Sequence, residues 1–365
     1  MSQIQDGIVL GILGGGQLGR MSAMAAARLG IEVITYSPVP DCPASHVSKD
    51  TIIAEYNDES ALKRFVDAVD IISYEFENIP IKTIEYIESL NLASVLPDKK
   101  LLHVSQDRIK EKTFLNDLGI STARWEPIKT TEDIQTHSNQ WKSDGFILKT
   151  ARFGYDGKGQ LKCTHNDTEQ QQTLQNFLKE TKDQELIMED FVNFSAEISV
   201  VIARDKYDKT VCYGPMLNEH ENQILCKTTV PCGMADSIRA QARAISTKIA
   251  DAVNLIGVLT VEFFVSNNGE LLVNEIAPRP HNSGHWTIDA CTVSQFENHV
   301  RTVCGLPVGL PSRNSHAVMI NLLGDDIDKI DQYMDDAKAC IHMYGKKTVK
   351  KDRKMGHITF ITPKT

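Results

Sequence analysis

The first hundred residues alternate between apolar runs and helix-forming segments, and this alternation restricts the fold more than any other feature of the chain. Apolar runs at 8–13, 31–36 and 71–74 predict buried strands. The Ala- and Met-rich segment 20–29 and the amphipathic segment 59–68 predict helices between them. A β-α-β-α-β order predicts a parallel sheet, because each parallel strand is added through a right-handed helical crossover.

The remainder of the chain predicts more helices and strands of mixed order. Helices are expected at 108–118, 168–179 and 236–253, and strands at 146–149, 185–188, 197–204, 209–214, 260–265 and 271–274. The last two strands flank Ser266-Asn267-Asn268-Gly269, and Asn-Gly between such runs is a hairpin signal. Short strands and a Lys/Arg-rich segment are expected in the tail, 317–365.

Composition excludes several classes of function. The chain has 365 residues, enough for two or three packed subdomains, and its 41% hydrophobic and 24% charged content is that of a globular protein. A net charge of −9 argues against nucleic-acid or anionic-membrane partners but leaves room for a local basic patch that binds a small anion. No signal peptide or membrane span is expected, and eight scattered cysteines predict reduced thiols in a cytoplasmic protein.

The loop LGGGQLGRM, residues 13–21, joins the first strand to the first helix. Its glycines Gly14, Gly16 and Gly19 fit G-x-G-x-x-G, and backbone N–H groups at a helix start form an anion cradle. A dinucleotide site also requires an acid at the end of the second strand, where this chain has Tyr36-Ser37-Pro38. The loop therefore favours another phosphate ligand over NAD or FAD, and a structural turn is the remaining alternative.

A second glycine-rich loop, residues 149–160, follows a predicted strand. Gly154, Gly157 and Gly159 allow the backbone to fold over phosphates, and Lys149 at the strand end can reach a phosphate oxygen. A surface hairpin with turn residues explains this loop equally well when it is considered alone.

Two acids stand inside the apolar strands of the predicted hairpin, Glu262 in TVEFFV and Glu275 in LVNEIAP. Buried acids are rare without a partner, and two facing carboxylates repel unless a cation lies between them. Mg²⁺ binds one or two carboxylates together with substrate phosphates, and Asn274 adds a neutral oxygen ligand. The alternative, outward-facing acids paired with lysines, is less favoured because the flanking residues are apolar.

Together these features resemble the ATP-grasp superfamily: a strand lysine, a glycine-rich lid, the strand end Met188-Glu189-Asp190-Phe191-Val192 and the acidic hairpin. The runs GGGQLGRM, YEFENIP, GYDGKGQ, NEIAPRPHNSGHW and RKMGHI resemble the 5-(carboxyamino)imidazole ribonucleotide synthases of purine biosynthesis over residues 11–357. Single motifs are shared across the superfamily, whereas their combination and order are specific.

The resemblance implies an ATP-grasp fold, α/β with an α+β central part. The expected domains are an N-terminal substrate-phosphate-binding domain at 1–107, a lid subdomain at 108–205, a metal-binding catalytic subdomain at 206–310 and a small C-terminal domain at 311–365. It also implies a cytoplasmic homodimer.

The resemblance implies a reaction as well. ATP phosphorylates bicarbonate to carboxyphosphate, and the exocyclic amine of 5-aminoimidazole ribonucleotide takes up the carbon as a carbamate, with ADP and phosphate as the other products. The main alternative is another ATP-grasp ligase, such as a formate-dependent glycinamide ribonucleotide transformylase. An NAD-dependent dehydrogenase leaves Glu262 and Glu275 unexplained, and a non-catalytic nucleotide-binding regulator has no reason to keep both metal acids, the lid and the acceptor loop.

On the ATP side, the resemblance implies that Glu262 and Glu275 hold Mg²⁺, with Mn²⁺ as an alternative, against the ATP phosphates. Backbone groups of Glu189 and Val192 would read the adenine edge, and Glu197 would bind the ribose hydroxyls. The implied ATP-binding residues are Arg108, Lys149, Gly154, Tyr155, Asp156, Gly157, Lys158, Gly159, Gln160, Glu189, Asp190, Phe191, Val192, Glu197, His220, Asn274 and Glu275.

On the acceptor side, Arg279 and His281 suit bicarbonate and its phosphorylated form, and Tyr155 and Asp156 in the lid help to deprotonate the amine. These four are the implied catalytic residues. The implied substrate-binding residues are Gln17, Leu18, Glu75, His281, Asn282, Lys346 and Arg353. The chain departs from the family at Phe153, where glycine is usual, and at 348–351, where an arginine is common.

Overall fold

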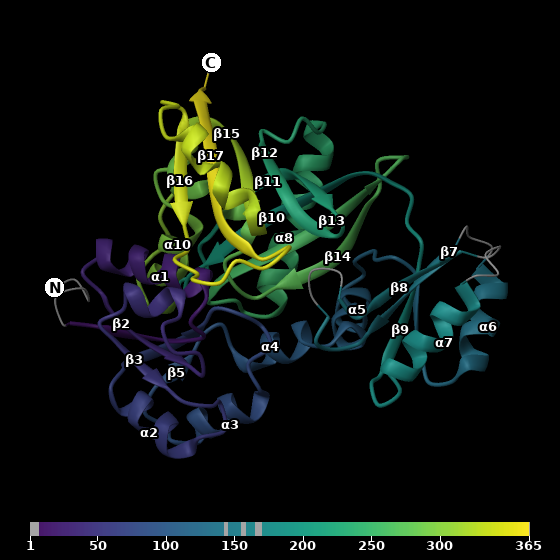
Figure 1. Cartoon of the computed structure of the whole chain (residues 1–365), viewed down its shortest axis with the longest axis horizontal. Coiled ribbons are helices and arrows are strands. Elements are labelled where there is room, and N and C mark those ends of the chain that lie inside the picture. Colours follow the sequence, from purple (N-terminus) through teal and green to yellow (C-terminus); the bar gives the residue numbers. More distant parts are fainter. Residues whose placement is uncertain (1–6, 142–144, 155–157, 165–169, 365) are drawn as a thin grey trace.

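The computed structural model describes residues 7–141, 145–154, 158–164 and 170–364. In Figure 1 the N-terminal sheet lies at one side, a smaller sheet with α6 and α7 at the opposite side, and the largest sheet above and between them. In this view the C-terminal strands lie above the N-terminal part of the chain. Within the described ranges, none of the helices is long and apolar enough to cross a membrane.

The N-terminal sheet is parallel, with the order β3-β2-β1-β4-β5. Its strands are β1 (Val9–Leu13), β2 (Glu32–Ser37), β3 (Asp50–Ile53), β4 (Ile71–Tyr74) and β5 (Ser94–Val95), accompanied by α1 (Gln17–Arg28), η2 (Pro43–His46), α2 (Glu59–Asp67), α3 (Ile81–Ser89) and α4 (Lys99–Ser105). The three central strands and the parallel arrangement agree with the sequence prediction. The two edge strands were missed because they are short and lack an apolar run.

The four-stranded sheet has the order β6-β9-β7-β8. It contains β6 (Trp125–Ile128), β7 (Gly145–Thr150), β8 (Gln160–Thr164) and β9 (Leu186–Asp190), with α6 (Thr131–Trp141) and α7 (Gln170–Glu180) packed against it. Leu148 and Met188 are fully buried at its centre. Helix α5 (Arg108–Asp117) leads into this unit from the N-terminal domain.

The largest sheet has the order β14-β13-β10-β11-β12-β15-β17-β16. Its strands are β10 (Phe194–Arg204), β11 (Thr210–Glu221), β12 (Ile224–Val230), β13 (Gly257–Ser266), β14 (Leu271–Ala277), β15 (Ser315–Leu323), β16 (Ala339–Met343) and β17 (Lys354–Pro363). The expected domain limit at 205 falls between the paired strands β10 and β11. The tail strands β15 and β17, predicted to be short, have nine and ten residues, and they continue this sheet.

The two faces of this sheet are covered by different helices. Ile198, Val200 and Ile202 of β10 pack with residues of α8 (Asp236–Ala252), whereas Val201 and Ala203 lie in the cluster that contains Trp286. This second face also meets η3 (Asn282–Gly284), α9 (Thr287–Ala290) and α10 (Gln295–Val303). Strand alternation places Glu197, Ser199 and Glu262 away from α8, toward the second face.

Candidate active site

The β13–β14 hairpin places two carboxylates side by side. Glu262 is the register partner of Glu275, and the register then shifts so that Phe263 faces Val273, which leaves Asn274 as the extra residue of a β-bulge. A bulge redirects a side chain that strand alternation would otherwise turn to the other face. The side-chain oxygen Oδ1 of Asn274 is buried without a hydrogen-bond partner. Two carboxylates and an unpartnered amide oxygen are the donors that a hard divalent cation binds.

Helix α5 holds the bulged strand β14 in place through two hydrogen bonds. Glu111 Oε1 accepts the Ile276 N–H at 2.7 Å, and Lys112 Nζ donates to the Asn274 carbonyl at 3.0 Å. Both contacts flank Glu275 and hold its backbone on either side. Sequence reasoning predicted a helix at 108–118 but assigned no role to these two residues. Their spacing of four and three residues from the buried Leu115 was the available signal.

Three cations and two anions gather beside this hairpin. Arg108 Nη1 lies 3.3 Å from Glu275 Oε2, and Lys149 Nζ donates to Glu189 Oε2 at 2.8 Å. Lys112, fully buried, lies 3.7 Å from Glu189 Oε1. Burial would raise the pKa of Glu189, but Lys112 and Lys149 outweigh it and hold the pKa at about 2. Glu189 is therefore ionised, and the cluster keeps a positive surplus that suits a polyphosphate.

The glycine-rich loop returns closely onto the end of β7. Gly159 has φ +71°, and a Cβ there would lie 2.6 Å from Thr150 Oγ1, so only glycine fits this approach. A Cβ on Gly154 would lie 3.9 Å from Arg108 Nη2, which places the loop over the cation cluster. Of the other predicted lid residues, Lys158 is exposed, the Gln160 amide donates to Gln223, and Tyr155, Asp156 and Gly157 lie outside the described residues.

The predicted adenine and ribose residues lie at the end of β9, just beyond it, or on β10 and β11. The Lys162 ammonium lies 3.9 Å from the centre of the Phe191 ring, and Asp190 pairs with Arg124 at 2.6 Å. Val192 is half-buried just beyond β9.

His220 Nδ1 lies 2.8 Å from Glu197 Oε2 across the β10–β11 pair. Burial would lower the pKa of His220, but the hydrogen bond to Glu197 outweighs it and raises the pKa. The Glu197 carboxylate therefore favours the protonated form of the His220 ring.

The segment after β14 carries the predicted acceptor residues. Arg279 donates from Nε and Nη2, one edge of its guanidinium, to the two carboxylate oxygens of Glu77, with Nη2 3.0 Å from Oε1. Burial would raise the pKa of Glu77, but Arg279 outweighs it and lowers the pKa to about 2. Sequence reasoning assigned no role to Glu77, although it lies in the YEFENIP run that carries part of the resemblance. Both amide atoms of Asn282 are buried without hydrogen-bond partners, as expected of a group that awaits a ligand.

His281 is fixed at both ring nitrogens. Its Nδ1 accepts the Ser283 backbone N–H at 3.3 Å and lies 2.9 Å from Ser283 Oγ, while Nε2 lies 2.9 Å from Glu262 Oε1. Because a backbone N–H can only donate, the hydrogen-bond network assigns the acceptor role to Nδ1 and the proton to Nε2. His281 therefore donates to a predicted metal ligand and is not free to act as a donor to bicarbonate in this arrangement.

A buried chain of hydrogen bonds supports this histidine from the centre of the sheet. Asn218 Nδ2 donates to Ser199 Oγ at 2.8 Å, and Ser199 Oγ donates to Ser283 Oγ at 2.8 Å. Ser199 and Ser283 are fully buried, and Asn218 nearly so. Because the amide nitrogen of Asn218 can only donate, Ser199 Oγ accepts its hydrogen and donates to Ser283 Oγ. The Ser283 hydroxyl then donates to His281 Nδ1.

The glycine loop after β1 holds a carboxylate of the protein itself. The backbone N–H groups of Gly16 and Gly19 donate to the Glu75 carboxylate, the latter at 2.8 Å, where α1 begins with Gln17 and Leu18. Burial raises the pKa of Glu75, and these two bonds and the charge of Lys346 only partly offset the shift. The anion cradle predicted from sequence is present, and Glu75 uses part of it.

The C-terminal segment reaches this same loop. A Cβ on Gly345 would lie 3.0 Å from His46 Nδ1 and 3.9 Å from Arg20 Nη1. Lys346 Nζ donates to the Lys354 carbonyl at 2.7 Å, and Arg353 Nη1 donates to the Thr348 carbonyl at 2.8 Å. Residues from both ends of the chain therefore meet beside the start of α1.

Comparison with known proteins matches nearly the whole chain. Residues 8–106 match the ribonucleotide synthetase pre-ATP-grasp domain, residues 113–296 the ATP-grasp domain, and residues 317–365 the phosphoribosylaminoimidazole carboxylase C-terminal domain. The N5-carboxyaminoimidazole ribonucleotide synthase of Brucella melitensis is 43% identical, with 100% of this chain and 99% of the relative covered. That of Bacillus subtilis is 39% identical, with 98% and 92% covered.

Solved structures give the same result. The N5-carboxyaminoimidazole synthetase of Staphylococcus aureus, complexed with ADP, superimposes with a TM-score of 0.91 at 36% identity, covering 98% of this chain and 93% of that chain. The synthase of Aspergillus clavatus, in complex with ADP and 5-aminoimidazole ribonucleotide, superimposes with a TM-score of 0.89 at 26% identity, covering 98% and 94%. The chain therefore belongs to the N5-carboxyaminoimidazole ribonucleotide synthase family of ATP-grasp enzymes.

Proposed function

We propose that this protein carboxylates the exocyclic amine of 5-aminoimidazole ribonucleotide, using ATP and bicarbonate, and releases N5-carboxyaminoimidazole ribonucleotide, ADP and phosphate. The observation that carries the proposal is the in-register pair Glu262 and Glu275 with the unpartnered oxygen of Asn274, placed beside a cluster of buried cations. The family membership supports the same reaction, since relatives named for it match over the full length.

Glu262, Glu275 and Asn274 would hold Mg²⁺, or Mn²⁺ in its place. When bound, such an ion neutralises charge on the ATP phosphates during phosphoryl transfer. Lys149 and Arg108 add fixed positive charge on the same side, and Gly154 of the glycine-rich loop lies beside Arg108. Exclusion of water by this loop protects carboxyphosphate, which water destroys.

Arg279 and Asn282 would bind bicarbonate and the carboxyphosphate formed from it. Glu77 holds the Arg279 guanidinium in place, so the group needs little reorganisation when an anion arrives. His281 orients Glu262 through Nε2, and Tyr155 and Asp156 are proposed to help remove the amine proton.

The phosphate of 5-aminoimidazole ribonucleotide would lie at the start of α1, against the backbone of Gln17 and Leu18, with Glu75 near the ribose. Lys346 and Arg353 would close this end from the C-terminal segment. We further propose that the protein is a cytoplasmic homodimer, and its eight free cysteines fit a reducing compartment.

The proposal is tested by ADP release from ATP and Mg²⁺ in bicarbonate buffer, with and without 5-aminoimidazole ribonucleotide. ADP release should depend on that nucleotide, and carbon-13 from bicarbonate should enter an acid-labile carbamate. Glu275→Gln should abolish both signals, whereas Glu270→Gln, an exposed acid on the same hairpin, should change neither. ADP release that instead requires formate and glycinamide ribonucleotide would assign the alternative ligase reaction.

A further inference from the structure

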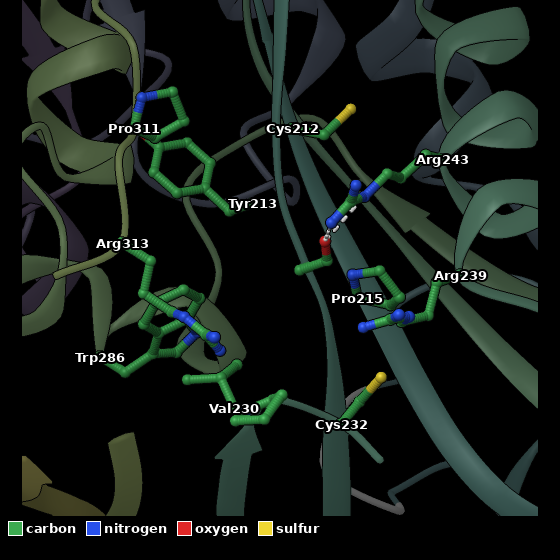
Figure 2. Close-up of a pocket in the computed structure, with 12 residues that line it drawn as sticks. Cys212, Tyr213, Pro215, Val230, Cys232, Arg239, Arg243, Trp286, Pro311 and Arg313 are labelled. Carbon is green, nitrogen blue, oxygen red and sulfur yellow. Dashed lines mark hydrogen bonds between the residues drawn. The ribbon is translucent and has the colours of Figure 1, made fainter. Parts of the chain in front are cut away.

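A cavity lies apart from the residues of the candidate active site (Figure 2). It lies between the first half of β11, the end of β12, the start of α8 and the segment that precedes β15. Its volume is about 200 Å³, and its twelve lining residues include none of those placed in the candidate active site above. The cavity is therefore a separate feature of the fold.

The lining of this cavity is strongly cationic. Arg239, Arg243 and Arg313 line it, and none of the twelve lining residues, all from the described part of the chain, is acidic. Figure 2 shows Arg239 and Arg313 extending toward the cavity from opposite sides. In a chain whose net charge is −9, three arginines around one cavity without a facing acid are unusual.

The guanidinium groups keep donors that the protein does not use. Arg243 Nε and Nη2 donate to the Gly214 carbonyl at 2.9 and 2.6 Å. These bonds fix the plane of the guanidinium, and its Nη1 donors make no hydrogen bond with the described residues. Arg239 pairs with Asp236, which is 89% exposed at its side chain and lies outside the lining. Arg313 is half-buried and makes no side-chain hydrogen bond or ion pair among the described residues. Such donors are satisfied by an anion that enters the cavity.

The other walls are apolar and limit the ligand. Trp286, Pro215 and Pro311 line the cavity, and Trp286 is 2% exposed. The volume is below the roughly 300 Å³ of the smallest pockets for drug-sized ligands, so the occupant is compact. Two guanidinium groups from α8 and a third from the opposite side match the tetrahedral oxygens of a phosphate, whereas one planar carboxylate faces a single guanidinium fork.

We propose that this cavity binds a phosphate group, as the free ion or on a small organic ester whose carbon part contacts Trp286 and the prolines. Glycerol 3-phosphate serves as the probe for an ester and inorganic phosphate as the probe for the free ion. The proposal concerns a site beyond the proposed reaction, and its test does not rely on catalytic activity.

The test follows Trp286, one of three tryptophans, by ¹⁹F NMR of protein labelled with 5-fluorotryptophan. Trp125→Phe and Trp141→Phe assign the resonances. Mg²⁺, ADP and 5-aminoimidazole ribonucleotide are present throughout to fill the candidate active site, and ionic strength is constant. Each probe is then titrated. The Trp286 resonance should shift saturably with at least one probe.

Arg313→Gln removes the donor that has no partner and should weaken the response about tenfold or more, the effect of losing one charge-assisted hydrogen bond. Arg313→Lys should retain part of it, and Arg64→Gln, an exposed arginine on α2, should leave it unchanged. A lower midpoint for glycerol 3-phosphate assigns an ester, and equal midpoints assign the free ion. The proposal is wrong if neither probe shifts Trp286 saturably, if Arg313→Gln responds as the unmodified protein does, or if the shift follows protein concentration.

Discussion

Phe153, in the glycine-rich loop, has a backbone conformation that favours glycine. Its φ of +63° lies in the left-handed region, which costs roughly 1–2 kcal/mol for a residue with a Cβ and almost nothing for glycine. The ring is 64% exposed. Sequence comparison identified the departure from the glycine usual in the family, and the backbone angle supplies the physical reason for that preference.

Glu111 is the residue whose titration should be visible in the stability of the protein. Burial and the nearby Glu275 raise its pKa from 4.5 to about 8. Between these values the folded protein holds a proton that the unfolded chain has released, so stability should fall as pH rises from roughly 5 to 8, by about 1 kcal/mol per pH unit. Glu111→Gln cannot titrate but keeps the oxygen that accepts the Ile276 N–H, and it should flatten this slope.

The measurement is urea unfolding of the metal-free protein, in EDTA, at several pH values across that window. Glu270→Gln on the exposed end of the β13–β14 hairpin is the control and should keep the slope of the unmodified protein. An unchanged slope in Glu111→Gln would show that Glu111 is ionised in the folded state throughout.

At the scale of elements, the apolar runs predicted the central strands and the long helices because continuous burial leaves a continuous apolar pattern. Edge strand β3, with only Ile52 and Ile53 as apolar residues, has no such pattern. The hairpin predicted that Glu262 and Glu275 would be neighbours. The bulge at Asn274 and the clamp by Glu111 and Lys112 depend on tertiary contacts between distant segments, which no local pattern records.

The hydrogen-bond chain from Asn218 to His281 should control metal affinity. Ser283→Ala breaks the link between Ser199 and His281, so the ring that orients Glu262 loses one of its three polar contacts and keeps the Ser283 N–H and Glu262. The apparent affinity for Mg²⁺ should fall by about tenfold, as expected for a residue that orients a metal ligand, while kcat at saturating Mg²⁺ should change little.

Two measurements check this prediction. Initial rates against Mg²⁺ concentration give the affinity, and ¹⁵N NMR of the imidazole reports which nitrogen of His281 carries the proton. Ser195→Ala is the matched control, because it also removes one serine hydroxyl, but that hydroxyl donates to the Val265 carbonyl and takes no part in the hydrogen bonds from Asn218 to His281. If Ser283→Ala keeps the metal affinity of the unmodified protein, the hydrogen-bond chain from Asn218 to His281 has no role in positioning Glu262.

At the scale of the whole molecule, the proposed substrate-phosphate end is assembled from the two ends of the chain. Gly345→Ala would add a Cβ 3.0 Å from His46 Nδ1 at a residue whose φ is +73°. The segment carrying Lys346 and the His46 ring of η2 must then separate by a few tenths of an ångström. The KM for 5-aminoimidazole ribonucleotide should rise several-fold, while the KM for ATP, bound elsewhere, should stay the same.

Steady-state kinetics with each substrate varied in turn provide the measurement. Gly233→Ala is the control, because Gly233 has a similar φ of +71° but nothing within 4 Å of an added Cβ. It imposes the same backbone cost without the collision. Equal effects of the two variants on the nucleotide KM would place the cause in general backbone strain.

During synthesis, one edge of a strand in the largest sheet stays exposed until its neighbouring strand leaves the ribosome. One edge of β12 is paired with β11, but the other is covered by β15, which begins only at Ser315 (Figure 1). Until that stretch is synthesised and released, β12 presents unsatisfied N–H and C=O groups that another nascent chain can pair with. Premature termination between the acidic hairpin and β15 would therefore yield a product prone to aggregate, even though it contains every residue of that hairpin.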